Sequence, residues 1–461
     1  MAATQKHLNN GGASGVLFTD RRDFYIDPQV TKELWTDVSP FTTVISNKET
    51  RQTNDPLFKM FEHRNPWVKQ EFQTSDVQAI ASDNAEDTCT IKAGTVVGLE
   101  GEGGDHAYTS WIGLECEIWD STKSTRRGSV LITNVAGSGS SADFNVKNLG
   151  NSTITTAAND YFVVIGSAHG EGTEAPEAWA DELQVVWNSC QIFKTPLQIT
   201  GTLLQASLRG ESSELARLRL QKSQEHKMQK ERAFLFGTRK GGTGLGEAAG
   251  QTSSDFTTAN EDFADGAITD IAPGGVAANA GNVVRTTYGV VSSLLDYGAT
   301  SGDHQNVFTV DSSYAYNNFV DDMEKVFQYV PEVGVKRAFC GAGAMGYWSK
   351  LAGVSGMAGN SGWTVNLSDM KRDTLGFNYK ILETPHGILQ LIPTPALRGP
   401  YNKYMLVIDE SNMFHAQYRS QMYQTNIKSD NAFDGVKDQY FSDEGVGISL
   451  LESHNLFKIT A

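Results

Sequence analysis

Two glycine-rich segments have the spacing most suggestive of chemistry, because a glycine loop that opens a helix can hold a phosphate group. The segment Gly341–Gly346 has the pattern GxGxxG between a strand-like run and a helix-like run. A dinucleotide site also needs a long helix, a second parallel strand and an acidic residue about 20 positions further on. Here the helical pattern soon gives way to glycines. We interpret the segment as a small-residue turn that packs against its neighbours, and keep a nicotinamide-dependent enzyme as an alternative.

Other motifs that could support catalysis or metal binding are incomplete. The segment Gly237–Gly250 contains Lys240, but it lacks the GxxxxGK pattern followed by Ser or Thr and comes after a helix, which indicates a loop. The nine histidines include no HExxH, and neither a GxSxG motif nor a cysteine-protease signature is present. Asn151 and Asn366 satisfy the glycosylation pattern, which has no meaning without a secretory signal. The sequence therefore predicts no catalytic residue, no cofactor-binding residue and no metal ligand, and no enzyme.

Cysteines and hydropathy limit where the protein works. No two of the four cysteines are close in sequence, so we expect reduced thiols and no zinc ribbon. No apolar run approaches the length of a membrane span, and the first 12 residues lack the pattern of a signal peptide. The cysteines are Cys89, Cys116, Cys190 and Cys340. These observations predict a protein of the cytosol that has no contact with a membrane.

Charge is distributed unevenly along the 461 residues. The net charge is −16, from 38 basic and 54 acidic side chains, which argues against a dedicated DNA-reading protein. Residues 76–182 hold 5 basic and 17 acidic residues, whereas residues 183–236 hold 8 basic and 4 acidic ones. The acidic segment is typical of a solvated outer domain, and a basic stretch follows it.

The chain begins with segments that cannot bury themselves. Residues 1–22 are polar, and Asp27-Pro28 starts a predicted short amphipathic helix that ends at Pro40. From Thr50 to Glu71 isolated aromatic residues stand among polar ones. Such an arm needs another surface to lie on.

Residues 76 to about 175 read as an all-β module, which we place as an insertion that projects from the main body. The alternation around residues 112–118 predicts a half-buried strand, and residues 130–135 and 161–165 predict further strands. The tryptophans of this region could form a platform for sugars, but alternating tryptophans are more often core residues. They are Trp111, Trp119, Trp179 and Trp187.

A strand-like run at residues 183–200 is followed by a long helix at Glu214–Phe236. Because residues 221–227 of this helix are polar on every side, we expect solvent-exposed surroundings. Two amphipathic helices follow, one ending at Gly298 and one running from Asp311 to before Pro331. Predicted strands close the chain at 377–382, 388–392, 404–408, 447–451 and 456–459. Helices grouped between sets of strands predict an α+β fold.

This order of elements resembles the major capsid proteins of tailed bacteriophages, which have the Hong Kong 97 fold. The resemblance rests on residues 206–237, similar to the long spine helix of the family's peripheral domain, and on residues 375–409, similar to the strands of its axial domain. It implies an α+β fold of the Hong Kong 97 type. The implied domains are an N-terminal arm at 1–75, an extended loop with a β insertion at 76–182, a peripheral domain at 183–262, an axial domain at 263–420 and a return to the peripheral domain at 421–461.

The resemblance also implies a function. The protein would be a structural subunit that forms hexamers and pentamers of an icosahedral shell around double-stranded DNA, which it contacts weakly and without sequence specificity. Scaffolding, portal and decoration proteins are possible partners, no cofactor is expected, and the shell would assemble in the host bacterial cytoplasm. Two alternatives remain open: an encapsulin-like compartment that encloses enzymes, and a carbohydrate-binding adhesin built on the β module.

Overall fold

The structure is a computed structural model, and the parts of the chain that it describes form two compact units. The main unit comprises residues 1–58, 187–241 and 261–461, and the barrel unit comprises residues 59–186 and 242–260. The described residues are 39–63, 71–82, 85–92, 111–136, 143–175, 183–206, 213–238, 285–301, 305–314, 316–329, 334–353, 366–367, 371–372, 375, 378–427 and 434–460. The predicted helix that starts at Asp27-Pro28 lies outside these residues.

The main unit contains a four-stranded sheet with one covered face. Its order is β1-β20-β21-β12, in which β1 runs parallel to β20 and the other pairs are antiparallel. Exposed and buried residues alternate along most of β12, because every second side chain faces the helix layer. The strands are β1 (Thr50–Gln52), β20 (Met413–Gln424), β21 (Gly435–Ile448) and β12 (Gln191–Thr200).

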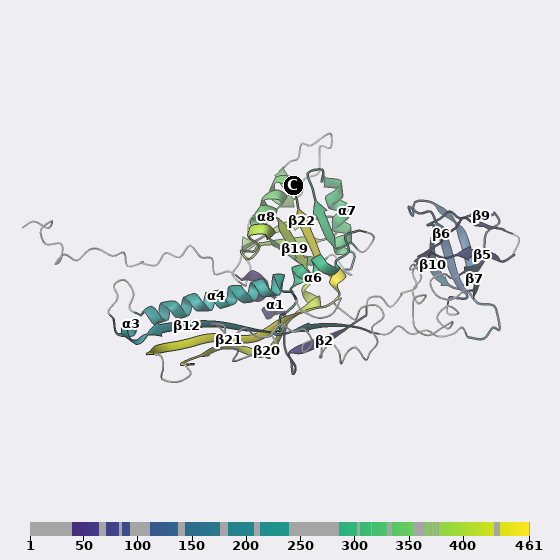
Figure 1. The fold of residues 1–461 in the computed structure, drawn as a ribbon. Helices are drawn as coiled ribbons and strands as arrows, with labels where there is room; N and C mark the ends of the chain where they lie inside the picture. The colour runs from purple at the N-terminus through teal and green to yellow at the C-terminus, as the bar shows by residue number, and fades with distance from the viewer. Residues whose placement is uncertain are drawn as a thin grey trace, which may run out of the picture. The chain divides into compact units, whose positions relative to one another are not determined.

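Helix α4 (Glu214–Phe236) lies along this sheet in Figure 1, where it runs beside β12 and β21. The Ser213 hydroxyl accepts a hydrogen bond from the Ala216 amide and so caps the start of the helix. The short helix α1 (Pro40–Lys48) contacts both α4 and β20. Helix α3 (Gly201–Gln205) connects β12 to the segment before α4.

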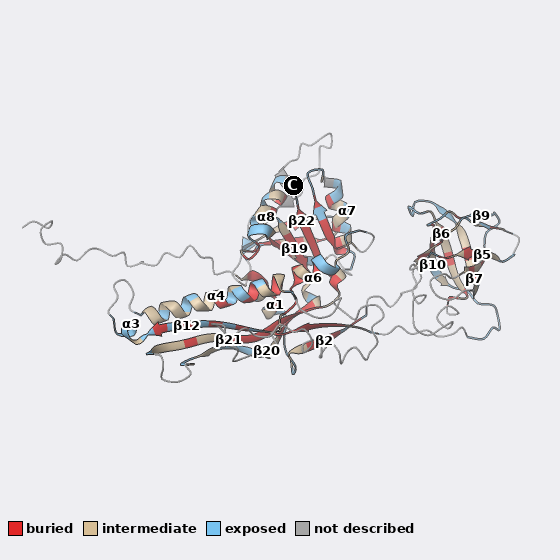
Figure 2. Cartoon of the chain, viewed as in Figure 1, coloured by how far each residue is buried: buried red, intermediate tan, exposed pale blue. Residues whose placement is uncertain are grey.

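A second sheet forms the core of the rest of the main unit. Its order is β13-β22-β19-β14-β18-β17-β15, and β16 pairs with β17. Figure 2 shows β19 and β22 as buried along most of their length. The strands are β13 (Val307–Val310), β14 (Val335–Cys340), β15 (Asn366–Leu367), β16 (Lys371–Arg372), β17 (Asn378–Glu383), β18 (Ile388–Pro393), β19 (Tyr404–Ile408) and β22 (Asn455–Ile459).

Helices α7 and α8 supply the apolar side chains that cover this sheet. Phe319 and Met323 of α7 and Trp348 of α8 belong to one core cluster with residues of β13, β14, β18, β19 and β22. The helices are α6 (Val290–Tyr297), α7 (Tyr316–Phe327) and α8 (Ala342–Gly353), and the short 3-10 turns are η3 (Gly399–Tyr401), η4 (Glu410–Asn412) and η5 (Leu451–Ser453).

The barrel unit holds a six-stranded antiparallel sheet of order β3-β10-β6-β7-β8-β5. The sheet closes on itself, because Thr74 beyond β3 bridges Ile91 beyond β5 and the Lys92 amide donates to the Gln73 carbonyl. Closure removes free strand edges. The strands are β3 (Glu71–Gln73), β5 (Asp87–Thr90), β6 (Leu114–Trp119), β7 (Arg126–Ala136), β8 (Asp143–Asn148) and β10 (Tyr161–Ser167), with a small pair β4 (Ala79–Ile80) and β9 (Ile154–Thr155).

Strands β2 (Leu57–Glu62) and β11 (Gln184–Ser189) pair where the chain leaves and re-enters the main unit. The barrel has its own core of buried side chains, in which Phe72 contacts the rings of Trp111, Phe144 and Phe162. The predicted β module is confirmed as an all-β fold, and its sheet begins at Glu71, before residue 76.

Most of the predicted elements are present, and several differences concern the two sheets of the main unit. The long helix and the strands near 378–383, 388–393 and 404–408 are confirmed. The expectation that α4 is surrounded by solvent is wrong, because His226, Lys230 and Glu231 are buried against the sheet. Strand β20 was not predicted, and β21 extends far before the predicted strand at 447–451. The last strand, β22, pairs with β13 and β19 in the second sheet rather than in the sheet under α4.

Candidate functional site

The GxGxxG segment is a packing turn at the start of α8. A Cβ atom on Gly341 would lie 2.2 Å from the backbone oxygen of Asn402, so no larger residue fits there. The amide of Ala344 donates to that same oxygen, and the amide of Gly343 donates to the Asn402 side chain. These amides of the first helical turn are therefore satisfied by the protein itself. The interpretation of this segment as a turn that packs against its neighbours is confirmed.

The four cysteines and two of the four tryptophans that the sequence brought forward lie in cores. All four cysteines are buried free thiols, and burial raises the pKa of Cys89, Cys116 and Cys190 to about 12, so they stay protonated. Trp111 and Trp187 are buried and cannot belong to a sugar platform, while Trp179 lies outside the described residues. Within the described part of the chain, no group of three or more His, Cys, Asp or Glu residues could hold a metal ion. No described helix is long and apolar enough to cross a bilayer.

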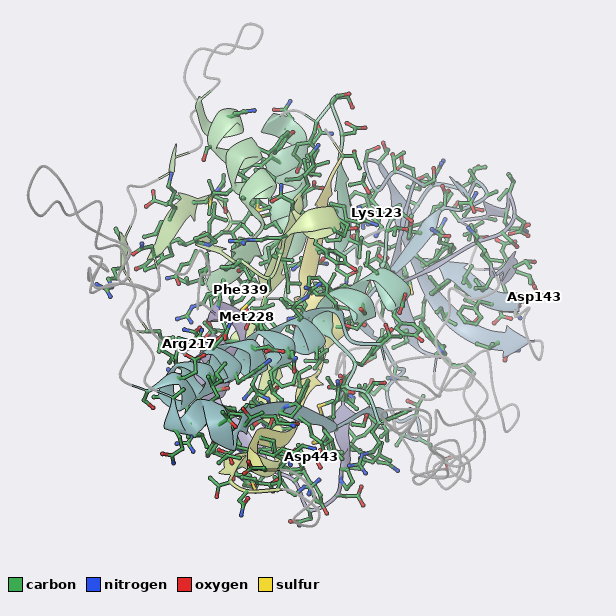
Figure 3. All side chains as sticks on the ribbon, turned by 60° about the vertical axis from the view of Figure 1, so that its left-hand side comes forward. Lys123, Asp143, Arg217, Met228, Phe339 and Asp443 are labelled. Atoms are coloured by element: carbon green, nitrogen blue, oxygen red, sulfur yellow. The ribbon has the colours of Figure 1, made fainter. Side chains whose placement is uncertain are left out.

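A group of buried polar side chains lies between α4 and α1 on one side and the four-stranded sheet on the other. We call this set the polar seam. In Figure 3 the labels Arg217 and Met228 mark α4, and the label Asp443 marks β21. Apolar packing alone does not fix how a helix lies on a sheet, whereas paired polar groups accept only one register. The seam consists of Thr195, His226, Lys230, Glu231, His415, Ser442 and Glu444.

Glu231 ties α1 to α4. Its Oε1 accepts a hydrogen bond of 3.1 Å from the Phe41 amide, and its Oε2 accepts bonds of 2.8 and 2.7 Å from the amide and hydroxyl of Thr42. Both amides belong to the first turn of α1, where no carbonyl of the same helix can reach them. Burial raises the pKa of Glu231 to about 7, although the three bonds favour the carboxylate. The other face of α1 packs on the second sheet, where Phe41 meets Phe339 edge to face.

Lys230, the residue before Glu231 on α4, and His415 of β20 both contact Glu444. Lys230 Nζ lies 3.2 Å from Glu444 Oε2 and donates to Gln421 at 2.8 Å, and His415 Nε2 lies 3.1 Å from the same Glu444 oxygen. Burial acts to raise the pKa of Glu444, but the His415 hydrogen bond and the Lys230 charge outweigh it, so the pKa is below its ordinary value. This buried charge group links α4 to β20 and β21.

His226 forms the third link. Its Nδ1 lies 3.0 Å from the Thr195 hydroxyl on β12, and its Nε2 lies 3.0 Å from the Ser442 hydroxyl on β21. A serine beside a histidine can be a catalytic pair, but both of these side chains have 0 % exposure and no substrate can reach them. The seam therefore fixes the helix on the sheet, and sequence reasoning missed it because its strand partners were not recognised.

The buried His226 should make the free energy of unfolding fall more steeply as the pH decreases. Burial lowers its pKa from 6.5 to about 4, so the unfolded chain binds the proton more tightly and stability is lost as the pH falls from 6.5 to 4. His226 alone should contribute on the order of 3 kcal/mol to this loss. Urea unfolding of the full chain at pH 6.5 and 4.5, compared with His226→Gln, should show a flatter pH dependence for the variant. Equal dependence in both proteins would contradict this role.

The arrangement defines a class of protein. A long helix laid on a four-stranded sheet, a second helix-covered sheet and a β unit inserted before the helix form the α+β Hong Kong 97 fold of shell-forming capsid subunits. The chain belongs to the SU10 major capsid protein family, because the sequence model of that family matches residues 29–446. It is thus a major capsid protein, a structural protein that forms the shell of a particle.

Solved structures similar to this chain are also shells. The capsid of a native GTA particle aligns at a TM-score of 0.45 with 8% identity, over 97% of this chain and 99% of that chain. The mature capsid of bacteriophage PhiM1 aligns at 0.33 with 10% identity, over 65% and 79%. An encapsulin from Synechococcus elongatus aligns at 0.34 with 9% identity, over 62% and 76%. No curated protein matches the sequence.

Proposed function

We propose that copies of this subunit form hexamers and pentamers of a closed icosahedral shell around double-stranded DNA, assembled in the host bacterial cytoplasm. α4 would face the DNA and the barrel unit would face the solvent. The difference in charge between the two parts supports this orientation: residues 76–182 carry 17 acidic against 5 basic side chains, whereas Lys227 and Arg232 of α4 are exposed cations. Most cations of α4 are paired with carboxylates, and the few others suit a container that must release its DNA, since each phosphate contact adds affinity.

The domain roles of the family remain part of this proposal. Residues 1–75 would act as an arm, the barrel unit as an insertion in the extended loop, the sheet under α4 as the peripheral domain and the second sheet as the axial domain. Sheet pairing supports two adjustments of the ranges: β20 goes with the peripheral domain and β22 with the axial domain. Many weak contacts between identical subunits then add up to a stable closed shell. Scaffolding, portal and decoration proteins stay possible partners.

Electron microscopy of the expressed chain, with and without candidate scaffold, tests the shell, and nuclease treatment of the particles tests the DNA. We expect closed particles that protect double-stranded DNA when packaging proteins are present. Particles that enclose a protein and never protect DNA would instead support the encapsulin-like alternative.

Cysteine labelling tests the orientation. The native cysteines are buried, so a maleimide should react only with an introduced cysteine. We expect Glu171→Cys, in an exposed turn of the barrel unit, to be labelled in intact particles. Lys227→Cys, on the exposed side of α4, should be labelled at least tenfold more slowly until the particles are opened. The reverse order of labelling would refute the orientation.

A further inference from the structure

A groove of about 440 Å³ runs between α1 and α4, with Gln421 of β20 at its side. Its lining contains hydroxyl, amide and ammonium groups but no carboxylate. The residues that line it are Ser39, Thr42, Thr43, Ser46, Asn47, Lys227, Lys230 and Gln421. Thr42 and Thr43 already donate to Glu231 and to the Ser39 carbonyl. The hydroxyl of Ser39, the side-chain amide of Asn47 and the ammonium group of Lys227 supply donors and a positive charge, which is the chemistry that an anion requires.

The wall that α1 contributes has the period of a helix face. Ser39 precedes the helix, and Thr42, Thr43, Ser46 and Asn47 follow at the spacing that places side chains on one side. The opposite side of α1, with Phe41, Val44 and Ile45, is buried. A solvent-facing side of a helix needs no such uniform set of short polar residues, so the stripe is consistent with a surface that meets a ligand.

The wall that α4 contributes holds two lysines in different states. Lys230 is buried, and its charge is compensated by Glu444 at 3.2 Å. Lys227 lies one turn earlier and is exposed, and the described structure gives it no ion pair. By contrast, Arg217, Arg219 and Lys222 of the same helix are each paired with a carboxylate. Lys227 is therefore the lysine of this lining whose charge no described ion pair compensates.

We propose that this groove binds one backbone phosphate of the enclosed double-stranded DNA, with Lys227 as the charged contact and the Ser39 hydroxyl and the Asn47 side-chain amide as hydrogen-bond donors. This inference rests on the proposed function, which places DNA next to α4. A phosphodiester carries one negative charge, matching the one uncompensated cation, and it accepts several hydrogen bonds at once. A contact to a backbone phosphate carries no base information, so we expect it to be independent of sequence.

The test measures binding of the full-length, unassembled chain to a mixed-sequence 20-base-pair duplex by fluorescence anisotropy, at 50 to 200 mM salt. Removing one phosphate contact reduces the slope of log K against log salt by about 0.9. We expect Lys227→Gln to show this change in slope and about fivefold weaker binding at 50 mM salt. An unchanged slope would overturn the proposal.

Lys194→Gln is the matched control. Lys194 is an exposed lysine of β12, and its neighbours Phe193 and Thr195 point to α4, so Lys194 lies on the other face of the sheet. We expect no change from this variant, and an equal loss from both would show that only net charge matters. Poly-glutamate as a second probe separates phosphate from carboxylate: stronger Lys227-dependent binding of poly-glutamate than of DNA would also overturn the proposal. If binding of the duplex depended on Lys227 but the assembled particles never protected DNA from nuclease, the proposed function would be refuted and the phosphate site would stand.

Discussion

Replacing Glu231 with alanine should release α1 from α4. The substitution leaves the buried amides of Phe41 and Thr42 without an acceptor, and each such orphan costs about 1 to 3 kcal/mol. We expect the attachment of α1 to weaken by about 4 kcal/mol. Hydrogen exchange of the amides of residues 41–48 in the full chain should become about a thousandfold faster, because each 1.4 kcal/mol changes an equilibrium tenfold. Unchanged protection of α1 would show that its apolar face alone holds it.

The control for this experiment is Glu225→Gln on the same helix. Glu225 pairs with Lys222 at a partly exposed position, so its removal should change stability by less than about 0.5 kcal/mol.

The pH dependence of the α1 attachment separates a charge effect of Glu231 from a general loss of packing. The pKa of Glu231 is raised to about 7, so the folded state holds the proton more tightly and this group stabilises the attachment of α1 less as the pH rises from 4.5 to 7. Glu231→Gln, which cannot titrate, should remove this dependence.

The attachment matters because α1 is more than a surface helix. It contacts α4 through Glu231 and meets the second sheet through Phe41 and Phe339, and its C-terminal end leads directly into β1. Loss of the Glu231 contacts would therefore loosen α4, the edge strand β1 and the second sheet together. The wall of the phosphate groove would move as well, so the Lys227 and Glu231 variants should not be combined when either proposal is tested.

Local patterns were sufficient to predict the elements that carry their own signal. The long helix was visible from the run of good helix formers between Ser213 and Gly237, and β19 from the apolar run Tyr404–Ile408. Both are determined mainly by residues near in sequence. The packing turn at Gly341 was also predictable, because the pattern after it does not continue as a dinucleotide fold would.

The polar seam and the antiparallel pair of β20 and β21 could not be predicted in the same way. Buried polar residues such as Asp438, Ser442 and Glu444 make β21 look like an exposed segment until their partners on α4 and β20 are known. The α4 partners of Glu444 and Ser442 lie 214 and 216 positions away along the chain. Closure of the barrel depends on a pairing between Thr74 and Ile91, which are near in sequence but lie at the two ends of the sheet order. Neither leaves a periodic signal in the sequence.

Replacing Phe72 with alanine should unfold the barrel unit and leave the main unit folded. Phe72 is 1 % exposed and contacts Trp111, Phe144 and Phe162 with ring centroids 4.9 to 5.6 Å apart. Removal of a buried phenyl ring leaves a cavity and costs about 3 to 5 kcal/mol, a large part of the stability of a domain of this size. The barrel has a separate core, so this loss should stay within residues 59–186.

Limited proteolysis of the full chain can measure this effect. In Phe72→Ala, cleavage sites should appear within residues 71–167 while the fragment containing α4 stays intact, whereas Phe61→Ala, at a side chain that is 70 % exposed, should behave as the unmodified chain. If α4 and β21 became equally sensitive, the two cores would depend on each other and the barrel would not be a separate insertion. If the variant still formed closed particles, the barrel would be dispensable for the shell, and the main unit would carry the contacts between subunits.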